Sequence, residues 1–313
     1  MTEKNFFTLA HLSDAHLCSL TELRFRELIN KRILGYFSWR LHRHAVHRDD
    51  VLAALVRDLH TLNPDHIVIT GDLTHLGTPS QFRMAQQFLH RLGPPEKVTV
   101  IPGNHDAYVR SAWNDTFARW AEYMVSDEKK PPDQLRANLP IEFPCLRVRG
   151  RVAVIGVSTA QPSAPFLAVG SIGSPQLQRL EKMLTELGRR HLFRVVLIHH
   201  PPVSGVVKWR KRLTDAAAFR AMVNRCGAEL VLHGHVHRNS FKYLNTTVNR
   251  VPVISVPSAS ALSQNPERRA RYHVYHIDPS SRGLDVLWSA HRYSAKKKQF
   301  VLESERNSLD LII

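Results

Sequence analysis

The sequence predicts an α/β protein in which strands and helices alternate. Short apolar runs, such as residues 97–101, are separated by segments whose leucines recur at helical spacing, such as residues 49–62. Polar clusters directly follow several of the apolar runs, and ligands of open α/β sheets bind at the carboxyl ends of strands. The chain of 313 residues fits one large domain or two smaller ones, and we expect one.

We place this domain over residues 1–293, with a basic amphipathic insertion at 18–48. Residues 294–313, which contain the run Lys296-Lys297-Lys298, are expected to form a C-terminal tail. The sequence contains no internal repeat and no low-complexity linker.

Cysteine use predicts a reducing compartment. The three cysteines, Cys18, Cys145 and Cys226, form no Cys-x-x-Cys pair, which argues against a disulfide framework or a thiolate metal site. The N-terminus lacks a basic region followed by a long apolar segment, and no apolar run is long enough to cross a bilayer. We therefore expect a cytoplasmic protein.

The chain is strongly basic, with 43 lysines and arginines against 27 aspartates and glutamates and a formal charge of +16. This charge favours anionic partners. It does not choose among nucleic acid, phosphorylated metabolites and anionic lipid. A generally basic surface explains the charge equally well, because no single tract dominates it.

Residues 6–12 are expected to form the first strand, which runs into Ser13-Asp14-Ala15-His16. In an extended chain Asp14 and His16 project to the same side. This spacing suits a carboxylate and an imidazole that converge on one metal ion. By itself the motif would favour a surface turn with an incidental histidine, so its interpretation depends on the later clusters.

Aromatic and aliphatic residues recur at helical spacing through residues 18–48, with arginines and lysines among them. The segment is therefore amphipathic and basic. It could cap the active site, touch a membrane surface, or pack as an ordinary helix on the body of the protein or on a second subunit. The sequence leaves these possibilities open.

A second strand is predicted at residues 66–70, after the helix of residues 49–62. It leads into Gly71-Asp72, so that a carboxylate again follows a strand, behind a glycine. Thr78-Pro79-Ser80-Gln81 has the form of a capping box with proline at the first helical position, and it predicts a helix to about Leu92.

The strand at residues 97–101 carries the densest polar cluster of the chain. Pro102-Gly103 ends this strand, and Asn104, His105 and Asp106 follow on the loop at its carboxyl end. An amide, an imidazole and a carboxylate in consecutive positions are rarely structural. This loop is therefore a candidate site.

Beyond this loop, the large apolar residues of 113–124 have helical spacing and predict a helix, followed by a charged loop at 126–140. Residues 142–157 are typical of a hairpin with Gly150 in its turn. A helix is expected from Ser174 to a terminating Gly188.

An almost wholly apolar strand at residues 193–198 ends in His199-His200, which brings two histidines to the same edge. After a helix at about 214–226, a strand at 229–232 runs into His233-Gly234-His235-Val236-His237. In an extended conformation His235 and His237 project to one side. Further strands are predicted at 251–256, 272–277 and 284–290.

These clusters, each following a predicted strand, resemble the ordered signature of the calcineurin-like metallophosphoesterases. The motifs that carry the resemblance are Asp14-x-His16, Gly71-Asp72, Gly103-Asn104-His105-Asp106, His199 and Gly234-His235-x-His237. The resemblance implies the fold of that family, a four-layer α/β/β/α sandwich of two mixed β-sheets flanked by helices.

The resemblance also implies two divalent metal ions, of Mn²⁺, Fe²⁺/Fe³⁺ or Zn²⁺. One ion would be held by Asp14, His16, Asp72 and His237, and the other by Asp72, Asn104, His199 and His235. Carboxylate, imidazole and amide oxygen are ligands of such ions. A hydroxide that bridges the two ions would attack phosphorus in line with the leaving oxygen.

In the same pattern His105 would donate a proton to the leaving oxygen, and Asp106 would orient the imidazole of His105. Other histidines neighbour the motifs without matching a ligand position. We interpret these as supporting or packing residues: His11, His75, His200 and His233.

Within the superfamily the motifs favour a phosphodiesterase. Residues 71–77 lack the Asp-Arg pair typical of the protein serine/threonine phosphatases, and Asp106 stands where those enzymes usually have glutamate. The chain more closely resembles the cyclic-nucleotide phosphodiesterase-like branch. A small-molecule or lipid-linked phosphodiester is therefore the expected substrate.

Two alternatives remain. A pyrophosphatase of a UDP-linked lipid A precursor would suit the basic segment 18–48, placed peripherally at an anionic membrane, but the better-known version of that enzyme carries arginine at the position of His105. A non-catalytic scaffold would be expected to have lost metal ligands, and none is missing. Nucleic acid as a partner and the oligomeric state are left open.

Overall fold

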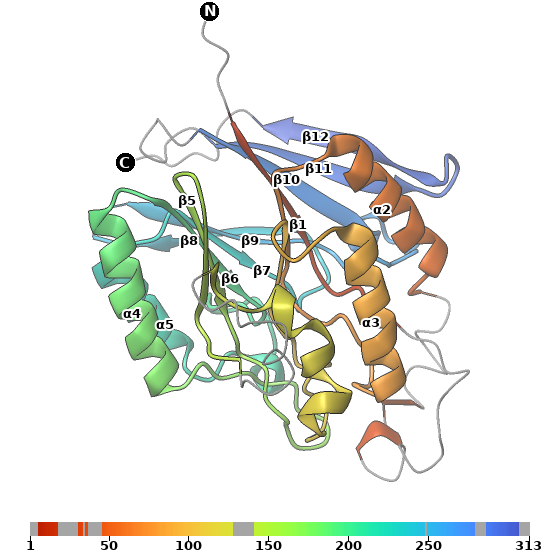
Figure 1. Ribbon diagram of the computed structural model, residues 1–313, viewed down its shortest axis with the longest axis horizontal. Helices are drawn as coiled ribbons and strands as arrows, with labels where there is room; N and C mark the ends of the chain where they lie inside the picture. The colour runs from red at the N-terminus through yellow and green to blue at the C-terminus, as the bar shows by residue number, and fades with distance from the viewer. Residues whose placement is uncertain are drawn as a thin grey trace, which may run out of the picture.

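The computed structural model describes residues 6–17, 31–33, 35–36, 46–127, 141–247, 249–278 and 286–306. Two six-stranded sheets lie face to face, and helices cover their outer faces (Figure 1). One apolar core lies between the two sheets. Each sheet also packs against its own helices through one further apolar core. The four-layer α/β/β/α sandwich predicted for this chain is confirmed.

The first sheet has the strand order β12-β11-β10-β1-β2-β3. Its parallel part consists of β1 (Phe7–Leu12), β2 (His66–Ile69) and β3 (Val98–Val100). Its antiparallel part consists of β10 (Arg271–Ile277), β11 (Val286–Ser294) and β12 (Gln299–Arg306). The sheet is therefore mixed, and its three parallel strands end at one edge.

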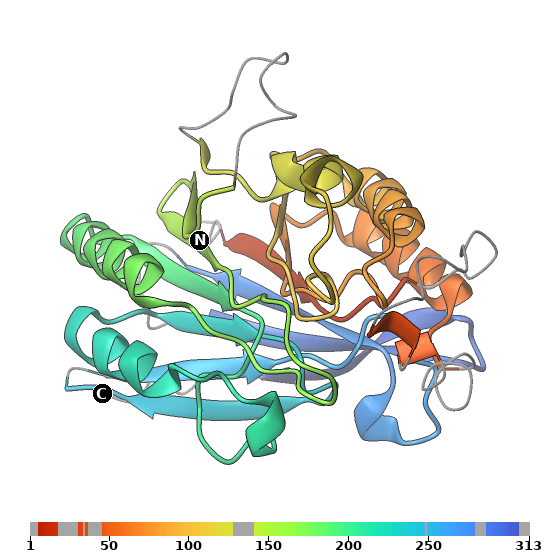
Figure 2. The same ribbon diagram turned by 90° about the horizontal axis from the view of Figure 1, so that it is seen from below.

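The second sheet has the strand order β4-β5-β6-β7-β9-β8. Its four central strands are parallel: β5 (Val152–Val157), β6 (Phe193–Ile198), β7 (Leu230–His233) and β9 (Arg250–Ser255). The edge strands run antiparallel to their neighbours: β4 (Cys145–Arg149) and β8 (Ser240–Asn245). Figure 2 shows both sheets from below, the side on which β1 ends.

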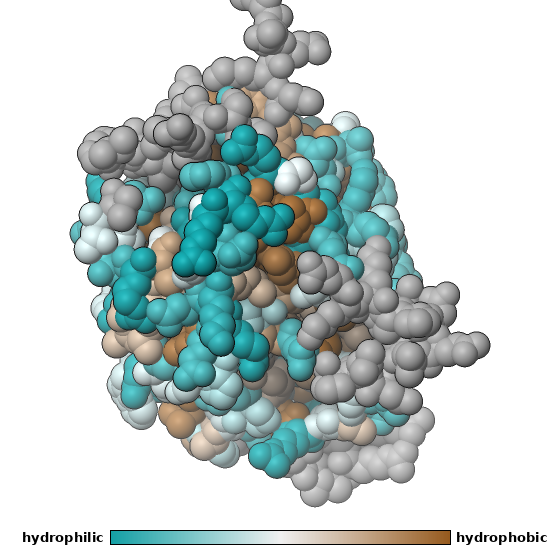
Figure 3. Space-filling model, turned by 60° about the vertical axis from the view of Figure 1, so that its left-hand side comes forward, coloured by the Kyte–Doolittle hydropathy of each residue, from teal (hydrophilic) through white to brown (hydrophobic). Residues whose placement is uncertain are grey.

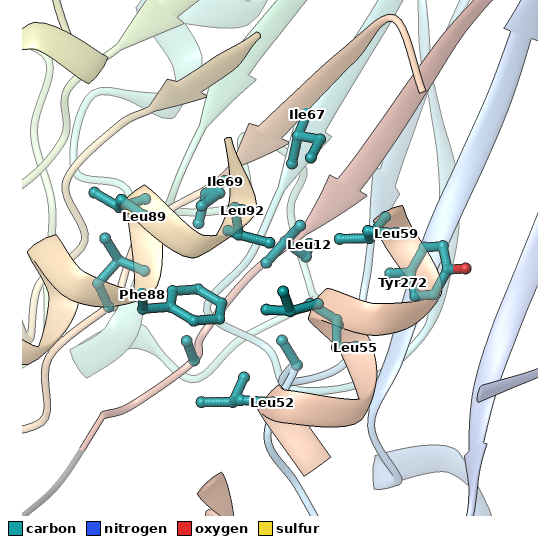
Figure 4. Packing of buried hydrophobic residues seen from close by; sticks show 14 of the residues in the cluster. Leu12, Leu52, Leu55, Leu59, Ile67, Ile69, Phe88, Leu89, Leu92 and Tyr272 are labelled. Atoms are coloured by element: carbon teal, nitrogen blue, oxygen red, sulfur yellow. The ribbon is translucent and has the colours of Figure 1, made fainter. Parts of the chain in front are cut away.

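Helices α2 (Asp49–Leu62) and α3 (Pro79–Leu92) cover the first sheet. Leucines of α2 and the side chains of Phe88, Leu89 and Leu92 of α3 gather around Leu12 and Ile69 of the sheet (Figure 4). Thr78 caps α3 as predicted, because its hydroxyl accepts the N–H of Gln81. These contacts fix the helices over the strands whose ends carry the polar clusters.

Helices α4 (Ser174–Arg189) and α5 (Ala216–Cys226) cover the second sheet. The inward leucines of α4, Leu180, Leu184 and Leu187, are buried. The outer face on this side of the molecule is mainly hydrophilic, with smaller hydrophobic areas between the polar side chains (Figure 3). The buried face of α4 thus carries leucines at helical spacing.

The structure differs from the predicted elements at several places. Gly188 lies inside α4, which continues to Arg189. The single helix expected at 113–124 is replaced by two 3-10 helices, η2 (Trp113–Asp115) and η3 (Phe117–Tyr123). The helical segment expected within 18–48 and the loop at 126–140 lie largely outside the described residues.

The predicted C-terminal tail, residues 294–313, is not a tail over its described part, residues 294–306. Residues 299–306 of this segment form β12, which pairs with β11 at the edge of the first sheet. Phe300 is buried there against Tyr272 and Tyr293. The sheet therefore extends to Arg306.

In the described part of the chain, no helix has the length and apolarity needed to span a bilayer.

Candidate metal centre

Five loops that follow β1, β2, β3, β6 and β7 carry all the residues predicted as metal ligands. Every one of these side chains is buried except that of His237, of which 30% is exposed. The parallel strands end at one edge, so their loops meet there. The structure thus brings the predicted ligands together from distant parts of the sequence.

The first group consists of Asp14, His16, Asp72 and His237, whose ligand atoms lie within 4.8 Å of one another. Asp14 Oδ1 is 3.0 Å from His237 Nε2 and 3.7 Å from His16 Nε2. This oxygen is buried and has no hydrogen-bond partner among the described residues. A buried carboxylate oxygen of this kind is costly unless a cation or a proton meets it.

The imidazoles of His16 and His237 face each other, with 3.1 Å between their Nε2 atoms. His16 Nδ1 lies 3.3 Å from the carbonyl oxygen of Thr74, a distance at which the ring can donate its proton to that carbonyl. The lone pair of His16 Nε2 then points at His237. Burial, followed by the neighbouring histidines, lowers the pKa of His16 well below its ordinary value, which favours this neutral form.

The second group consists of Asp72, His199 and His235, whose ligand atoms also lie within 4.8 Å of one another. His199 Nε2 is 3.3 Å from Asp72 Oδ2 and 3.1 Å from Asn104 Oδ1. The second nitrogen of each histidine is held by a backbone carbonyl, since His199 Nδ1 lies 2.6 Å from Thr70 O and His235 Nε2 lies 3.1 Å from Lys211 O. Such contacts orient ligating imidazoles.

Asp72 belongs to both groups. Burial alone would raise the pKa of its carboxyl, but the imidazoles of His199, His105 and His16 lower this pKa well below its ordinary value. Its Oδ1 also accepts the backbone N–H of His105 at 2.8 Å. The carboxylate of Asp72 is therefore ionised and lies where it can touch two cations.

Glycines allow this close approach of the loops. A Cβ atom on Gly103 would lie 2.1 Å from Asp72 Oδ1, and one on Gly234 would lie 2.0 Å from Ser13 Oγ and 2.6 Å from Asp14 Oδ2. All three distances are too short for a real Cβ atom. The glycine that precedes each of these motifs is therefore required by sterics.

The backbone is strained at the same positions. Five predicted ligands have positive φ angles: Asp14 (54°), His16 (45°), Asp72 (55°), His235 (69°) and His237 (50°). The left-handed region is uncommon for non-glycine residues, and strain of this kind gathers at functional sites. Taken with the buried carboxylates and the opposed imidazoles, the donor set fits two borderline divalent cations.

Asp106 does not orient His105, which corrects the sequence-based interpretation. The Asp106 carboxylate accepts hydrogen bonds from the N–H groups of Gly103, Thr74 and Leu73 and from the Thr74 hydroxyl. Burial, followed by the charge of Asp72, raises the pKa of Asp106 to about 7. Asp106 therefore joins the loop after β2 to the loop after β3.

The carbonyl oxygen of His75 takes the orienting role instead, since it lies 2.6 Å from His105 Nδ1. The imidazole ring of His75 and the phenol ring of Tyr108 also stack on the imidazole of His105, with centroids at 5.1 and 5.7 Å. His75 was excluded from the ligand set, yet its ligand atom lies within 4.8 Å of those of His16 and His105. Its backbone role has no signal in the sequence, because any residue has a carbonyl.

His200 adjoins the predicted ligand His199 and is predicted to be a supporting or packing residue. Its ring lies 4.5 Å from that of His235, but Thr159 Oγ1 is 2.7 Å from its Nδ1 and Ala168 O is 3.2 Å from its Nε2. Both ring nitrogens are thus engaged by the protein. His200 supports the site without offering a lone pair to a metal.

His47 is a neighbour that the sequence did not indicate. Its ring centroid lies 4.7 Å from that of His16, and its Nδ1 is 2.8 Å from Ser260 Oγ. The residue follows no strand and belongs to no motif, so no pattern predicts its position. Long-range pairing with Ala261 brings it to the site.

A family model described as calcineurin-like phosphoesterase matches residues 7–239. This chain belongs to the calcineurin-like phosphoesterase family. It is therefore a phosphoric ester hydrolase of the metallophosphoesterase class. The match spans β1 to the loop that carries His235 and His237, and so includes every predicted ligand.

Several relatives are named as phosphodiesterases. The chain is 27% identical over 242 residues to a probable cyclic nucleotide phosphodiesterase of Vesicomyosocius okutanii, covering 76% of this chain and 88% of that one. It is 26% identical over 267 residues to a cAMP/cGMP dual specificity phosphodiesterase of Mycobacterium tuberculosis, covering 83% and 69%. A probable glycerophosphodiester phosphodiesterase of Arcobacter nitrofigilis is 26% identical over 206 residues, covering 63% and 64%.

Two solved structures share the fold. A dimetal phosphatase from Danio rerio superposes with a TM-score of 0.57 at 12% identity, covering 95% of this chain and 98% of that one. A purple acid phosphatase from yellow lupin superposes with a TM-score of 0.56 at 12% identity, covering 96% and 53%. At this identity, the likeness concerns the fold.

Proposed function

We propose that this protein is a dinuclear metal-dependent phosphodiesterase that acts on small phosphodiesters. The observation that carries the proposal is the position of Asp72, whose carboxylate is shared by two groups of ligand atoms, each within 4.8 Å. A site with one shared carboxylate suits two ions that act on one phosphoryl group.

In this proposal Asp14, His16, Asp72 and His237 hold one ion, and Asp72, Asn104, His199 and His235 hold the other. When bound, the two ions would polarise the phosphoryl group and lower the pKa of a water molecule. The carbonyls of Thr74, Thr70 and Lys211 keep His16, His199 and His235 in the tautomers that ligation requires.

His105 is proposed to protonate the leaving oxygen. The His75 carbonyl holds the proton of His105 Nδ1, which makes Nε2 the nitrogen that exchanges a proton with substrate. Stacking on His75 and Tyr108 limits rotation of the ring. A fixed ring keeps the donor aligned with the leaving group without an aspartate partner.

The substrate class is proposed from the relatives. Cyclic nucleotide phosphodiesterases and a glycerophosphodiester phosphodiesterase match this chain over 206 to 267 residues. Mn²⁺, Fe²⁺/Fe³⁺ and Zn²⁺ all suit the donor set. The relatives named above give no support to a pyrophosphatase for a UDP-linked lipid A precursor, and a non-catalytic scaffold has no need of the strained ligand loops.

The test is hydrolysis of bis(p-nitrophenyl) phosphate by protein reconstituted with Mn²⁺. We expect turnover that falls by orders of magnitude in Asp72→Ala. Asp215→Asn is the matched control, because this carboxylate accepts the N–H groups of Ile172 and Gly173 outside the site. Equal turnover in Asp72→Ala and wild type would refute the proposal.

A panel of cyclic nucleotides, glycerophosphodiesters, UDP-linked lipids and phosphomonoesters then distinguishes substrate classes. We expect the highest kcat/KM for a diester. Preference for a phosphomonoester would contradict the phosphodiesterase assignment while leaving the metal centre intact.

A further inference from the structure

Two aromatic side chains stand exposed beside the metal centre. Phe166 is 80% exposed and Trp209 is 69% exposed, whereas large aromatic residues of soluble proteins are usually much more buried. Neither residue belongs to a family motif or to the proposed metal centre. Their exposure therefore needs a separate explanation.

Phe166 is held outward by a strained turn. Leu167 N donates to Ala164 O at 3.1 Å, which places Pro165 and Phe166 at the centre of a β-turn. Phe166 has a φ of 65°, at a position where such turns normally carry glycine. A bulky residue with positive φ is a genuine outlier, and the exposed tip 164–166 carries no polar side chain.

Trp209 stands in a cationic run. Lys208, Arg210, Lys211 and Arg212 flank it, and all five side chains are exposed. The stretch 199–214 and the loop 160–172 contain no aspartate or glutamate. Apolar tips and positive charge are therefore combined in these two segments, and the carboxylate of Asp215, which follows the second segment, accepts the N–H groups of Ile172 and Gly173.

The two loops form one surface next to the site. Ala168 N donates to Arg210 O at 2.9 Å, and Gly170 N donates to Arg212 O at 3.1 Å. The same loops contact the histidines of the centre, through Lys211 O to His235 and Ala168 O to His200. In Figure 2 the short helix η5 (Trp209–Lys211) lies beside the loop 160–170, on the side where the strands end.

We propose that this surface, the aromatic-basic face formed by the loop 160–170 and residues 208–212, docks the protein on anionic lipid bilayers. Phe166 and Trp209 enter the boundary between headgroups and acyl chains, and the four cations meet the anionic headgroups. The formal charge of +16 adds long-range attraction to the same surface.

A bilayer fits this face better than a nucleic acid. Single-stranded nucleic acids stack their bases on aromatic rings along a basic groove, with phosphates close to every ring. Here the tip 164–166 offers only Ala, Pro and Phe. Three consecutive apolar residues at an exposed tip suit the interior of a lipid interface, and the Lys31 ammonium, which donates to Ser163 O at 2.8 Å, adds a cation beside this tip.

The test is co-sedimentation of the full chain with vesicles of phosphatidylcholine and phosphatidylglycerol, compared with phosphatidylcholine alone. We expect wild type to bind the anionic vesicles, and Phe166→Ser with Trp209→Ser to lose about tenfold or more in affinity. Leu302→Ser is the matched control, because Leu302 is 52% exposed on β12. This variant should bind like wild type.

Charge is tested separately with Lys208→Gln and Arg210→Gln, which leave the Lys211 carbonyl contact to His235 in place. We expect binding to weaken and to lose much of its salt dependence. Thermal unfolding and hydrolysis of bis(p-nitrophenyl) phosphate should be unchanged in all these variants. The proposal would be overturned if the wild-type protein did not bind anionic vesicles, bound neutral vesicles equally well, or bound only single-stranded RNA. Unaltered vesicle binding by the variant with both serine substitutions would also overturn it.

Discussion

His16 and His237 face each other with 3.1 Å between their Nε2 atoms, and both nitrogens also face Asp14 Oδ1. Because the Thr74 carbonyl can accept the His16 Nδ1 proton, lone pairs meet between the two rings. Opposed lone pairs repel each other unless a proton or a cation lies between them. A cation bound between the two rings would relieve this repulsion.

Asp14→Asn is expected to remove most of the thermal stabilisation by Mn²⁺ without lowering the stability of the metal-free protein. Asp14 Oδ1 is buried without a hydrogen-bond partner in the described structure, whereas Oδ2 accepts the His235 N–H, which an amide oxygen can also accept. Metal at about a thousand times its Kd adds about 4 kcal/mol to the free energy of unfolding. Differential scanning fluorimetry with EDTA and with Mn²⁺ measures the difference. The exposed Asp50→Asn serves as control, and an undiminished Mn²⁺ effect in Asp14→Asn would contradict this assignment.

His235→Asn and His200→Asn form a matched pair, because their rings lie 4.5 Å apart and both are buried. We expect His235→Asn to reduce the metal content of the purified protein by about half, since two-metal sites lose one ion with one ligand set. His200→Asn should retain both ions and lose stability by about 1–3 kcal/mol, because Thr159 and Ala168 lose a partner. Elemental analysis and denaturant unfolding give both values. Equal metal loss in the two variants would mean that His200 is a ligand.

His105→Asn should slow hydrolysis most for substrates with poor leaving groups, because these depend on a proton donor. Asp106→Asn should leave that leaving-group dependence unaltered. The Asp106 carboxylate accepts the Thr74 and Gly103 N–H groups and does not reach the imidazole, so its replacement should reduce stability instead. A series of aryl phosphodiesters of graded leaving-group pKa separates the two roles. If the rate of Asp106→Asn depended more steeply on leaving-group pKa than that of wild type, Asp106 would be the residue that orients His105.

Stability is expected to fall as the pH drops below 6.5, in part through His66. Burial, followed by the charges of Arg149 and Arg147, lowers the pKa of His66 from 6.5 to about 3. Below pH 6.5 the imidazole of His66 is therefore protonated in the unfolded chain, whereas in the folded chain it stays neutral until about pH 3. Between these two pH values, one such histidine lowers the free energy of unfolding by about 1.4 kcal/mol for each pH unit.

Urea unfolding of wild type and His66→Asn at pH 7 and pH 5.5 tests this linkage. The variant should lose the contact with Thr99 Oγ1 at both pH values but show a shallower pH dependence. Thr99→Val, which removes the same contact without removing a titratable group, should keep the wild-type slope. An identical slope in His66→Asn would show that the folded protein protonates this imidazole freely.

Much of this fold could be predicted because local patterns agree with the tertiary structure. The buried strands carry continuous apolar runs, and α2 and α3 carry clear apolar faces that pack as expected. The candidate metal ligands come together because each follows a strand and parallel strands end at one edge. A site at strand ends can be predicted from sequence when its residues, such as aspartate and histidine, are typical metal ligands.

The predictions that were wrong concern elements whose structure depends on tertiary contacts. The helix expected at 113–124 breaks at Thr116, whose φ of −127° and ψ of −106° separate η2 from η3, while the ring of Trp120 packs on that of Phe82. β12 depends on distant partners, since Glu303 binds Arg271 and Arg292 from neighbouring strands. The role of Asp106 was misassigned because its partners are backbone N–H groups, which no sequence pattern displays.

Titration of metal-free protein with Mn²⁺, with hydrolysis of bis(p-nitrophenyl) phosphate measured at each step, tests the central claim most directly. The shared position of Asp72 predicts that activity rises to a plateau at about two ions per chain. Asp72→Asn should fail to reach it at any metal concentration. A plateau at one ion per chain, or full activity in the presence of chelator, would contradict the dinuclear account.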